Sequence, residues 1–290
     1  TRAWILLLVL ILSAVFLRLI LKRCAPFFRF LKSLFVSIEW GIAANPDIQR
    51  LIKKNPNLFE FIKQRLSKNQ FSGLPLTLLA FVFIYVLFLL LGVIQGVITS
   101  APIVAVDIRI ENLLYIFRDA ELIKVFSWIT LLAKWQIIVS TAIVVSLILW
   151  LLQKRVYLLP LWIVIAGSEL LNSLGKLFFH RVRPVFAIYT ESSFSFPSGH
   201  ATIAVAFYGF IIYILYRHVK KRRYKINALF SGLMVILAIG FSRLYLGVHY
   251  LSDVFGGYLL GSLWLIIGIS ISEWFGYRRD VSLFTQTKRV

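Results

Sequence analysis

Apolar runs of about twenty residues recur along this chain, and they limit what it can fold into more than any other feature. A helix needs about 20 apolar residues to cross the ~30 Å hydrocarbon core of a bilayer. The chain is 60% hydrophobic and only 15% charged, whereas soluble domains average about 25% charged residues. The runs long enough to span are 3–21, 75–98, 135–152, 156–179, 200–217, 226–246 and 250–272. We therefore expect an all-α, polytopic membrane helix bundle, with one extra span ahead of a six-span core.

The stretches around these runs predict how the chain is organised. The expected parts are an N-terminal transmembrane span (1–23), a basic amphipathic connector (24–74), the main domain (75–275) and a basic tail (276–290). In the connector, Asn45-Pro46-Asp47 is typical of a helix start or a turn, since Asn and Asp cap helices and Pro fits the first turn. The polar residues 100–126 predict a loop. Gly257 and Gly261 predict close packing of the last run on a neighbouring helix. With Cys24 as the single cysteine, an intramolecular disulfide is excluded.

The net charge of +20 would suit a nucleic-acid binder, but its distribution favours a membrane protein. The basic residues gather in blocks between the apolar runs, at 22–72, 153–155, 217–225 and 278–289. With seven alternating spans, all of these blocks fall on one side of the membrane, and loops rich in Lys and Arg mark the cytoplasmic side. We expect an integral protein of a bacterial inner membrane without a nucleic-acid partner. The opposite, periplasmic or outer face would carry 99–134, 177–199 and 247–250.

Lys176 and Arg183 form the first of three motifs on that opposite face, seven residues apart and followed by Pro184. If one helix held both cations, they would share a face about two turns, ~10 Å, apart. A helix stop is expected at Pro184. A lysine ammonium and an arginine fork can together neutralise a phosphate dianion. Taken alone, the pair fits equally well two cations that anchor a helix end at the membrane surface.

Pro197-Ser198-Gly199-His200 forms the second motif, at the start of an apolar run. Ser198 is expected to cap the helix, and free N–H groups at a helix start bind anions. Gly199 would let the backbone approach a phosphate closely. His200 would then stand beside the bound group, ready to protonate a leaving oxygen. An ordinary capped helix start with an interfacial histidine is the alternative.

His249 and Asp253 form the third motif together with Arg243, which ends the preceding run, and Gly247, which predicts a break. Residues at i and i+4 lie on one face of a helix. The carboxylate can therefore hold the proton of one ring nitrogen and leave the other nitrogen free as a nucleophile. A structural His–Asp pair at a membrane interface is the alternative.

Together, the three motifs resemble the signature of the type 2 phosphatidic acid phosphatase superfamily, the lipid phosphate phosphatases. That signature is Lys-x6-Arg-Pro, Pro-Ser-Gly-His and Ser-Arg-x5-His-x3-Asp. The chain matches it at 176–184, 197–200 and 242–253 without a departure, and the resemblance covers roughly residues 75–272. It implies a six-span phosphatase that needs no metal and no other cofactor, because cations and helix N–H groups supply the charge stabilisation.

The resemblance also implies a role for each matching residue. His249 would attack phosphorus and form a phosphohistidine, Asp253 would orient that ring, and His200 would protonate the leaving alcohol. The phosphate oxygens would be held by Lys176, Arg183, Arg243 and the backbone at Ser198 and Gly199. Outside the signature, Glu169 lies within a predicted span, where a carboxylate needs a partner. It would steady Lys176, line the path of the head group or form a structural contact between helices.

These expectations describe a hydrolase for a lipid phosphate or pyrophosphate whose tails stay in the bilayer. Candidate substrates are undecaprenyl pyrophosphate, phosphatidylglycerol phosphate, phosphatidic acid and a lipid A phosphate. Two alternatives remain open: a lipid-linked phosphotransferase that passes the phosphate to an acceptor other than water, and a non-catalytic lipid-binding membrane protein. Oligomeric state is open as well. Residues 45–73 resemble the connector of bacterial proteins that fuse a DedA-type membrane domain to such a phosphatase, so an upstream domain is a further expectation.

Overall fold

The computed structural model describes residues 73–100 and 102–287 continuously, and before them residues 11–16, 18–20 and 45–57 and a few other positions. The chain forms two compact units, one of residues 7–78 and a larger one that includes residues 79–290. In the smaller unit, 45–47 starts a helix rather than a turn: α2 spans Pro46–Lys54, and the Asp47 N–H donates to the Asn45 side-chain oxygen at 2.9 Å. Residues 8, 11–16 and 18–20 of the predicted span 3–21 are helical, and the rest of that span and most of the connector lie outside the described residues. The resemblance of residues 45–73 to a DedA fusion stays a prediction.

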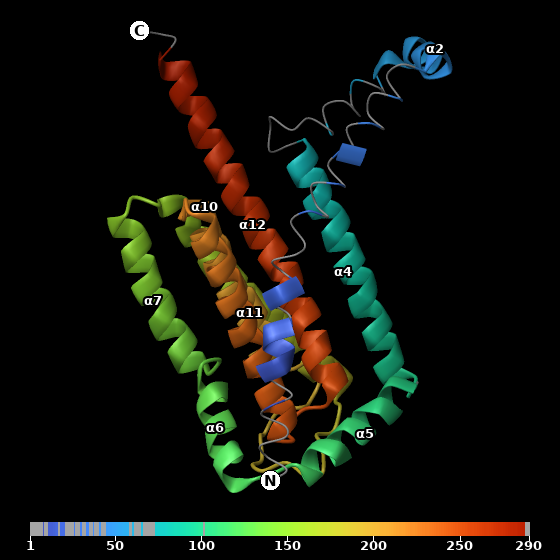
Figure 1. Ribbon diagram of the computed structural model, residues 1–290, viewed down its shortest axis with the longest axis vertical. Helices are drawn as coiled ribbons and strands as arrows, with labels where there is room; N and C mark the ends of the chain where they lie inside the picture. The colour runs from blue at the N-terminus through green and yellow to red at the C-terminus, as the bar shows by residue number, and fades with distance from the viewer. Residues whose placement is uncertain are drawn as a thin grey trace. The chain divides into compact units, whose positions relative to one another are not determined.

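Every regular element in the described part of the chain is helical, which confirms the all-α fold (Figure 1). The first half of the larger unit consists of α4 (Leu74–Ile98), α5 (Pro102–Ile116), α6 (Ala120–Leu131), α7 (Trp135–Leu151) and the short η1 (Arg155–Tyr157). The second half consists of α8 (Leu158–Phe179), α9 (Gly199–Ile203), η2 (Ala204–Tyr208), α10 (Gly209–His218), α11 (Arg222–Tyr245) and α12 (Leu251–Thr287).

Five of these helical stretches are long and apolar enough to cross a membrane: Leu74–Ile98, Arg155–Phe179, Gly199–His218, Arg222–Tyr245 and Leu251–Tyr277. A sixth is present if α6 and α7, which are bent by 46° at their junction, are counted as one broken span. The predicted core of six spans is therefore present on this count. The last of them continues into residues predicted as a tail, since α12 runs to Thr287.

The expectation of a loop at 100–126 is wrong, because this segment folds into α5 and the first half of α6. In this segment Asp119 starts a helix and Asp107 faces inward, while Arg109 and Lys124 are exposed on α5 and α6. Asp119 caps α6 through its side chain, which accepts the Glu121 N–H at 2.9 Å. Asp107 on α5 is 1% exposed. Asp119 and Asp107 have partners in the fold and the exposed residues are solvated, so the polarity of this segment does not prevent helix formation.

Close packing of α12 against α8 and α9 forms the centre of the larger unit. The prediction for Gly257 and Gly261 is confirmed. A Cβ at Gly257 would lie 2.6 Å from the Ser198 carbonyl oxygen, and one at Gly261 would lie 2.3 Å from that of Thr202. Only glycine permits this approach of two helix backbones. The contact fixes the start of α9 against the first turns of α12.

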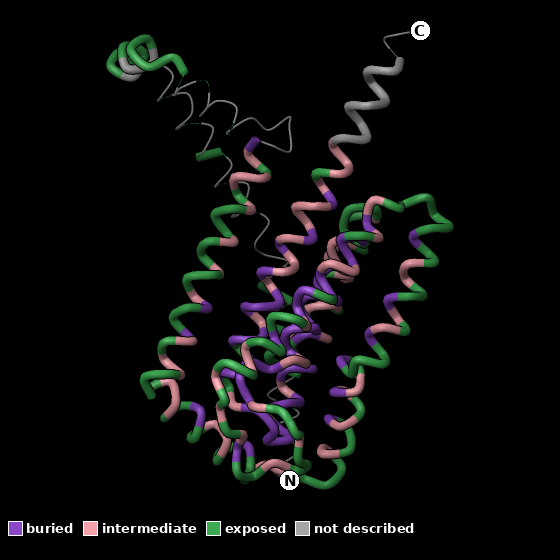
Figure 2. Tube along the Cα trace, turned by 180° about the vertical axis from the view of Figure 1, so that it is seen from behind, coloured by how far each residue is buried: buried purple, intermediate pink, exposed green. Residues whose placement is uncertain are grey.

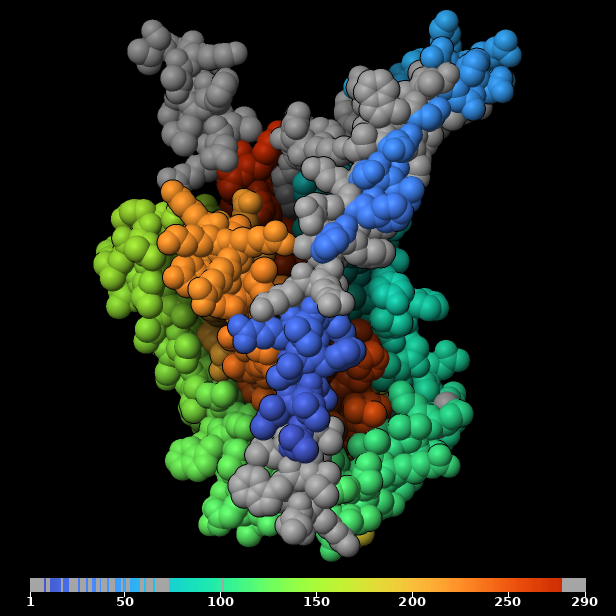
Figure 3. Space-filling view, in the orientation of Figure 1, coloured from blue at the N-terminus to red at the C-terminus, as the bar shows by residue number. Residues whose placement is uncertain are grey.

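The buried residues lie mainly in this packed centre of the larger unit (Figure 2). The buried residues concentrate on α8, α9, η2 and α12, whereas α4 and α7 are exposed along much of their length. The exposed side chains of α4 include Phe81, Ile84 and Phe88, and those of α7 include Ile143 and Leu147. In the space-filling view α7 and α11 reach the surface of the molecule (Figure 3). Large apolar side chains on the outside suit a surface that faces lipid.

Candidate active site

The three sequence motifs meet at one end of the larger unit. The loop between α8 and α9 lies at the same end as α5, and the connection between α10 and α11, which carries the basic block 217–225, lies at the other end (Figure 1). The turn between α11 and α12 passes through Gly247, whose φ is +66°. A Cβ there would lie 2.8 Å from the Phe186 carbonyl oxygen. The predicted break at Gly247 is confirmed, and it needs glycine for both its backbone conformation and its space.

His249 and Asp253 face each other as expected, although they are not two turns of one helix. His249 lies in the turn before α12, which begins at Leu251. Its Nδ1 is 3.4 Å from Asp253 Oδ2, longer than an ordinary hydrogen bond. The same oxygen accepts the Tyr250 N–H at 2.8 Å, so the carboxylate also caps the start of α12. Both side chains are buried, at 1% and 0% exposure.

Arg183 lies beside Nε2, the ring nitrogen of His249 that does not face Asp253. The expectation of one helix with Lys176 is wrong, because α8 ends at Phe179 and His180 follows in the left-handed region with φ 48°. Arg183 lies in the loop, where its Nε donates to the Ser193 carbonyl oxygen at 2.7 Å. Its Nη1 donates to the Val248 carbonyl oxygen at 2.7 Å and is 3.2 Å from His249 Nε2. These contacts aim the guanidinium at the imidazole.

Arg243 is completely buried near the end of α11, which is unusual for an arginine without several partners. Its Nη1 donates to Tyr189 Oη at 2.6 Å and to Thr130 Oγ1 at 3.0 Å. Its Nη2 pairs with Glu191 Oε1. The other oxygen of Glu191 pairs with Arg183 Nη2 at 2.6 Å. A single carboxylate therefore bridges the two arginines that the sequence assigns to phosphate binding.

The two bridged arginines affect the pKa of Glu191. Although burial opposes ionisation, Arg243 and Arg183 lower the pKa of Glu191 from 4.5 to about 2. The glutamate is therefore a full anion at neutral pH. It occupies the position between two guanidinium groups that an anionic ligand would be expected to take.

Lys176 lies in the last turn of α8 and donates to Ser193 Oγ at 2.9 Å. Ser193 Oγ also accepts from Arg183 Nη2 at 3.1 Å, so one hydroxyl connects the two cations. Within the described part of the chain, neither a hydrogen bond nor an ion pair joins Lys176 to Glu169, although the charge of Glu169 acts on the lysine. The suggestion that Glu169 steadies Lys176 stays a prediction.

The Pro-Ser-Gly-His motif begins α9, as expected, but Ser198 does not cap it through its side chain. The Ser198 N–H donates to the Asp253 carbonyl oxygen at 3.0 Å. Its Oγ is buried without a hydrogen-bond partner in the structure. Ser198 can therefore reach a phosphate through its hydroxyl rather than through its backbone. At Gly199 a Cβ would lie 2.9 Å from Asn172 Nδ2, which explains why glycine stands there.

His200 follows in the first turn of α9. The charges of Arg243, Glu191 and Lys176 all act on its ring, as does His249. The structure thus brings together Lys176, Arg183, Ser198, Gly199, His200, Arg243, His249 and Asp253, which are the residues that the sequence motifs single out.

Residues that the sequence analysis missed complete the site. Glu191 gave no signal, because a glutamate in a loop is usually solvated. Arg181 lies inside the first motif at a variable position, and it pairs with both Asp253 and Asp107. Asp107 stood in the segment expected to be a loop. Arg181 was visible in the sequence as a cation, but its partners Asp253 and Asp107 lie 72 and 74 residues away along the chain. In the described residues, no group of three or more His, Cys, Asp or Glu side chains could hold a metal ion.

Comparisons with known proteins identify the family of the chain. Residues 157–277 match the PAP2 superfamily. Phosphatidylglycerophosphatase B of Bacillus subtilis (strain 168) is 33% identical over 180 residues, which cover 61% of this chain and 88% of that protein. The chain belongs to the PAP2 superfamily. Among solved structures, the transmembrane PAP2-type phosphatidylglycerolphosphate phosphatase of Bacillus subtilis matches with a TM-score of 0.62 and 29% identity, covering 66% of this chain and 96% of that one.

Membership of the PAP2 superfamily confirms the resemblance carried by the three motifs. The protein is an integral membrane enzyme with a polytopic PAP2 fold. It is a lipid phosphatase, that is, a phosphoric monoester hydrolase that acts on a lipid phosphate in the membrane.

Proposed function

We propose that the enzyme removes the phosphate of a membrane phospholipid through a phosphohistidine on His249. The observation that carries this proposal is the setting of the ring. Its Nδ1 faces Asp253, and its Nε2 lies 3.2 Å from Arg183 Nη1. An arginine N–H can only donate, so Nε2 is the unprotonated nitrogen. A lone pair beside a guanidinium can attack a phosphorus whose oxygens that cation holds.

Protonation favours the same role. Burial, together with the charges of Arg243 and Arg183, lowers the pKa of His249 to about 4, although Asp253 opposes this effect. The imidazole is therefore neutral at physiological pH and can act as a nucleophile. After attack, the ring carries a positive charge, which the Asp253 carboxylate stabilises. Asp253 thus holds the ring before the reaction and balances its charge during it.

The remaining residues divide between phosphate binding and proton transfer. Lys176, Arg183 and Arg243, with Ser198 Oγ and the Gly199 N–H, hold the phosphate oxygens. In the first step the N–P bond forms and the bond from phosphorus to the lipid oxygen breaks, while His200 gives a proton to that oxygen. In the second step water attacks phosphorus, His200 takes a proton from the water, and His249 is released. The cations supply the charge stabilisation for both steps.

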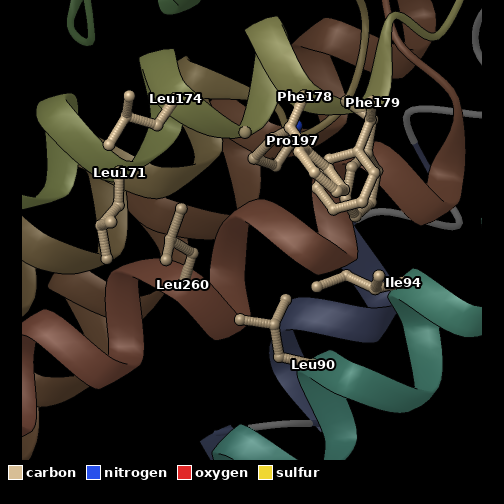
Figure 4. Close-up of a pocket in the computed structure, with 10 residues that line it drawn as sticks. Leu90, Ile94, Leu171, Leu174, Phe178, Phe179, Pro197 and Leu260 are labelled. Carbon is tan, nitrogen blue, oxygen red and sulfur yellow. The ribbon is translucent and has the colours of Figure 1, made fainter.

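An apolar cavity of the protein beside the site would hold the lipid part of the substrate. A cavity of about 430 Å³ lies between α4, α8 and α12 (Figure 4). It is lined by Leu90, Ile94, Leu171, Leu174, Gly175, Phe178, Phe179, Phe196, Pro197 and Leu260. Two of the lining residues, Gly175 and Pro197, directly precede Lys176 and Ser198 in the chain, so the cavity lies close to the proposed phosphate site. An acyl chain in this cavity would leave its head group at Lys176.

Phosphatidylglycerol phosphate is the substrate that we propose first. The relative with 33% identity is named a phosphatidylglycerophosphatase, and the similar solved structure is a phosphatidylglycerolphosphate phosphatase. We place the site on the periplasmic or outer face of a bacterial inner membrane. The support is the basic block 217–225, which lies at the opposite end of the helices and marks a cytoplasmic side.

The test is phosphate release from a panel of lipid phosphates by purified enzyme and by His249→Ala, each with and without EDTA. The panel includes phosphatidylglycerol phosphate, phosphatidic acid and undecaprenyl pyrophosphate. We expect release that EDTA does not affect, that is fastest with phosphatidylglycerol phosphate, and that falls by at least about 1,000-fold in His249→Ala. Acid-labile, base-stable label on the wild type after rapid quenching from labelled lipid would identify the phosphohistidine.

Two results would refute the proposal. Undiminished release by His249→Ala would mean that another group attacks phosphorus. Transfer of labelled phosphate to an added lipid or sugar acceptor, with little free phosphate, would mean that the enzyme is a transferase.

A further inference from the structure

The carboxylate of Asp253 is bound at Oδ1 by Arg181, which is not one of the signature residues. Oδ2 faces His249 and accepts from Tyr250 N–H and Ser195 Oγ. Oδ1 accepts from Arg181 Nη1 at 2.5 Å. A carboxylate held at both oxygens cannot rotate about its Cβ–Cγ bond, so Oδ2 stays directed at the imidazole.

Arg181 is itself fixed by Asp107 of α5. Its Nη2 donates to Asp107 Oδ2 at 2.7 Å, and its Nη1 also donates to Ser252 Oγ at 2.7 Å. Asp107 is tied to the start of α12, since its Oδ1 accepts the Ser252 N–H at 2.8 Å and its Oδ2 accepts the Ser252 hydroxyl at 2.5 Å. The guanidinium lies over the Tyr250 ring at 4.5 Å. Arg181 therefore has one available orientation.

The charges in this cluster alternate. Two buried carboxylates, Asp107 and Asp253, flank one guanidinium. Burial disfavours the charged form of Arg181, but the two carboxylates more than offset it, and the pKa of Arg181 is raised above its ordinary value. Without this cation, two buried negative charges would be left without their shared partner. A buried, unpaired carboxylate takes up a proton more readily.

We propose that Arg181, locked in place by Asp107, is a positioning residue that keeps Asp253 ionised and directed at His249. The inference rests on the proposed role of His249 as the nucleophile. Arg181 does not belong to the phosphate-binding group, because both of its Nη atoms are engaged by Asp253, Ser252 and Asp107. Its loss should therefore slow the chemical step without weakening the binding of phosphate.

The pH dependence of kcat is the readout that separates positioning from general damage. The charged or titratable groups that face Asp253 are Arg181 and Arg183 from the α8–α9 loop, His249 and Tyr250 from the α11–α12 turn, and Asp107 from α5 through Arg181. Of these, Arg181 supplies the cation in direct contact with Oδ1. When it is removed, Asp253 protonates at higher pH, and the acid limb of kcat moves upward.

The experiment compares Arg181→Ala, Arg181→Lys and Asp107→Asn with wild type and with His249→Ala. Arg109→Ala is the matched control, because Arg109 is exposed on α5, two residues from Asp107. For each purified variant, kcat and KM for phosphatidylglycerol phosphate are measured from about pH 4 to 9, together with the inhibition constant of inorganic phosphate. Arg181→Ala is also assayed with added guanidinium at millimolar concentration. Asp107→Asn leaves the arginine in place, so it keeps the test informative if Arg181→Ala does not fold.

We expect kcat to fall by about 10–100-fold in Arg181→Ala and by less in Arg181→Lys and Asp107→Asn. KM and the phosphate inhibition constant should stay within about twofold, the acid limb should move upward, and guanidinium should restore part of kcat. Arg109→Ala should match wild type.

An unchanged kcat in Arg181→Ala, with His249→Ala inactive, would overturn this inference and leave the proposed nucleophile intact. A rise in KM and in the phosphate inhibition constant at constant kcat would overturn it as well, since Arg181 would then bind phosphate. Activity retained in His249→Ala would instead refute the proposed function.

Discussion

Replacing Glu191 with glutamine should make the enzyme bind inorganic phosphate more tightly. The Glu191 carboxylate bridges Arg183 and Arg243, two of the cations proposed to hold the phosphate. A phosphate dianion that reaches both guanidinium groups must first displace this carboxylate. Glutamine keeps the size and the hydrogen-bonding oxygen of the side chain but removes its charge. The competition between the two anions is then weakened.

The size of the effect follows from the pKa of Glu191, which is lowered from 4.5 to about 2. At about 1.4 kcal/mol per pKa unit, its surroundings stabilise the charged carboxylate by roughly 3 kcal/mol. The Glu191 side chain is 23% exposed to solvent, so water screens part of this interaction. Taking half of the value gives about 1.5 kcal/mol, which is about a tenfold change in a binding constant.

The assay is product inhibition. The inhibition constant of inorganic phosphate is measured for wild type, Glu191→Gln and Glu121→Gln. Glu121 is an exposed glutamate on α6 that pairs with Lys124, so it controls for the loss of one negative charge. We expect the constant to fall about tenfold in Glu191→Gln and to stay within twofold in Glu121→Gln. A constant that is unchanged or higher in Glu191→Gln would refute the reasoning, because the carboxylate would then support phosphate binding instead of competing with it.

Three further outcomes are expected. Because the pKa of His249 is about 4 and the neutral ring is the active form, kcat/KM should be constant from about pH 8 down to about 5 and fall only near pH 4; a fall centred at about 6.5 would contradict the buried ring. Gly261→Leu should destabilise the enzyme by about 1–3 kcal/mol in a thermal unfolding assay in detergent, since a Cβ already meets the Thr202 carbonyl oxygen at 2.3 Å, whereas Gly92→Leu, where nothing lies within 4 Å, should not. Arg243→Lys should raise KM about tenfold with the fold retained, because one ammonium cannot replace the fork that contacts Thr130, Tyr189 and Glu191.

The spans and the signature could be predicted because both are local in the sequence. An apolar run of twenty residues reports its own environment, and the motifs place reactive groups at helix ends. The residue at which a helix ends was harder to predict from the sequence. The expectation that Lys176 and Arg183 share a helix failed because α8 ends at Phe179, four residues before Arg183. Carbonyl oxygens of Ser193 and Val248, distant in sequence, hold Arg183 in the loop instead.

The partners of the signature residues could not be predicted, because they depend on contacts across the fold. Asp107 contacts Arg181 over 74 residues, and Glu191 reaches Arg243 over 52 residues. Each of these acidic side chains looks solvated in the sequence, and its burial follows from where α5 and the α8–α9 loop pack. From the sequence alone, a polar segment such as 100–126 therefore predicts a loop, because the pairing of Asp107 with Arg181 is visible only in the fold.

Glu191 also bears on how the fold accommodates the buried cation Arg243. Arg243 is completely buried, and a buried arginine without an anion would be strongly destabilising. The Glu191 carboxylate supplies that anion until a phosphate replaces it, so it should favour stability and oppose ligand binding at the same time. Glu191→Gln should then unfold at a lower temperature than wild type without ligand, and saturating phosphate should restore most of the difference, because phosphate binds the folded state. A variant that binds phosphate more tightly and yet is as stable as wild type without ligand would show that Tyr189 and Thr130 suffice to accommodate Arg243, and that the carboxylate has no part in stabilising the empty site.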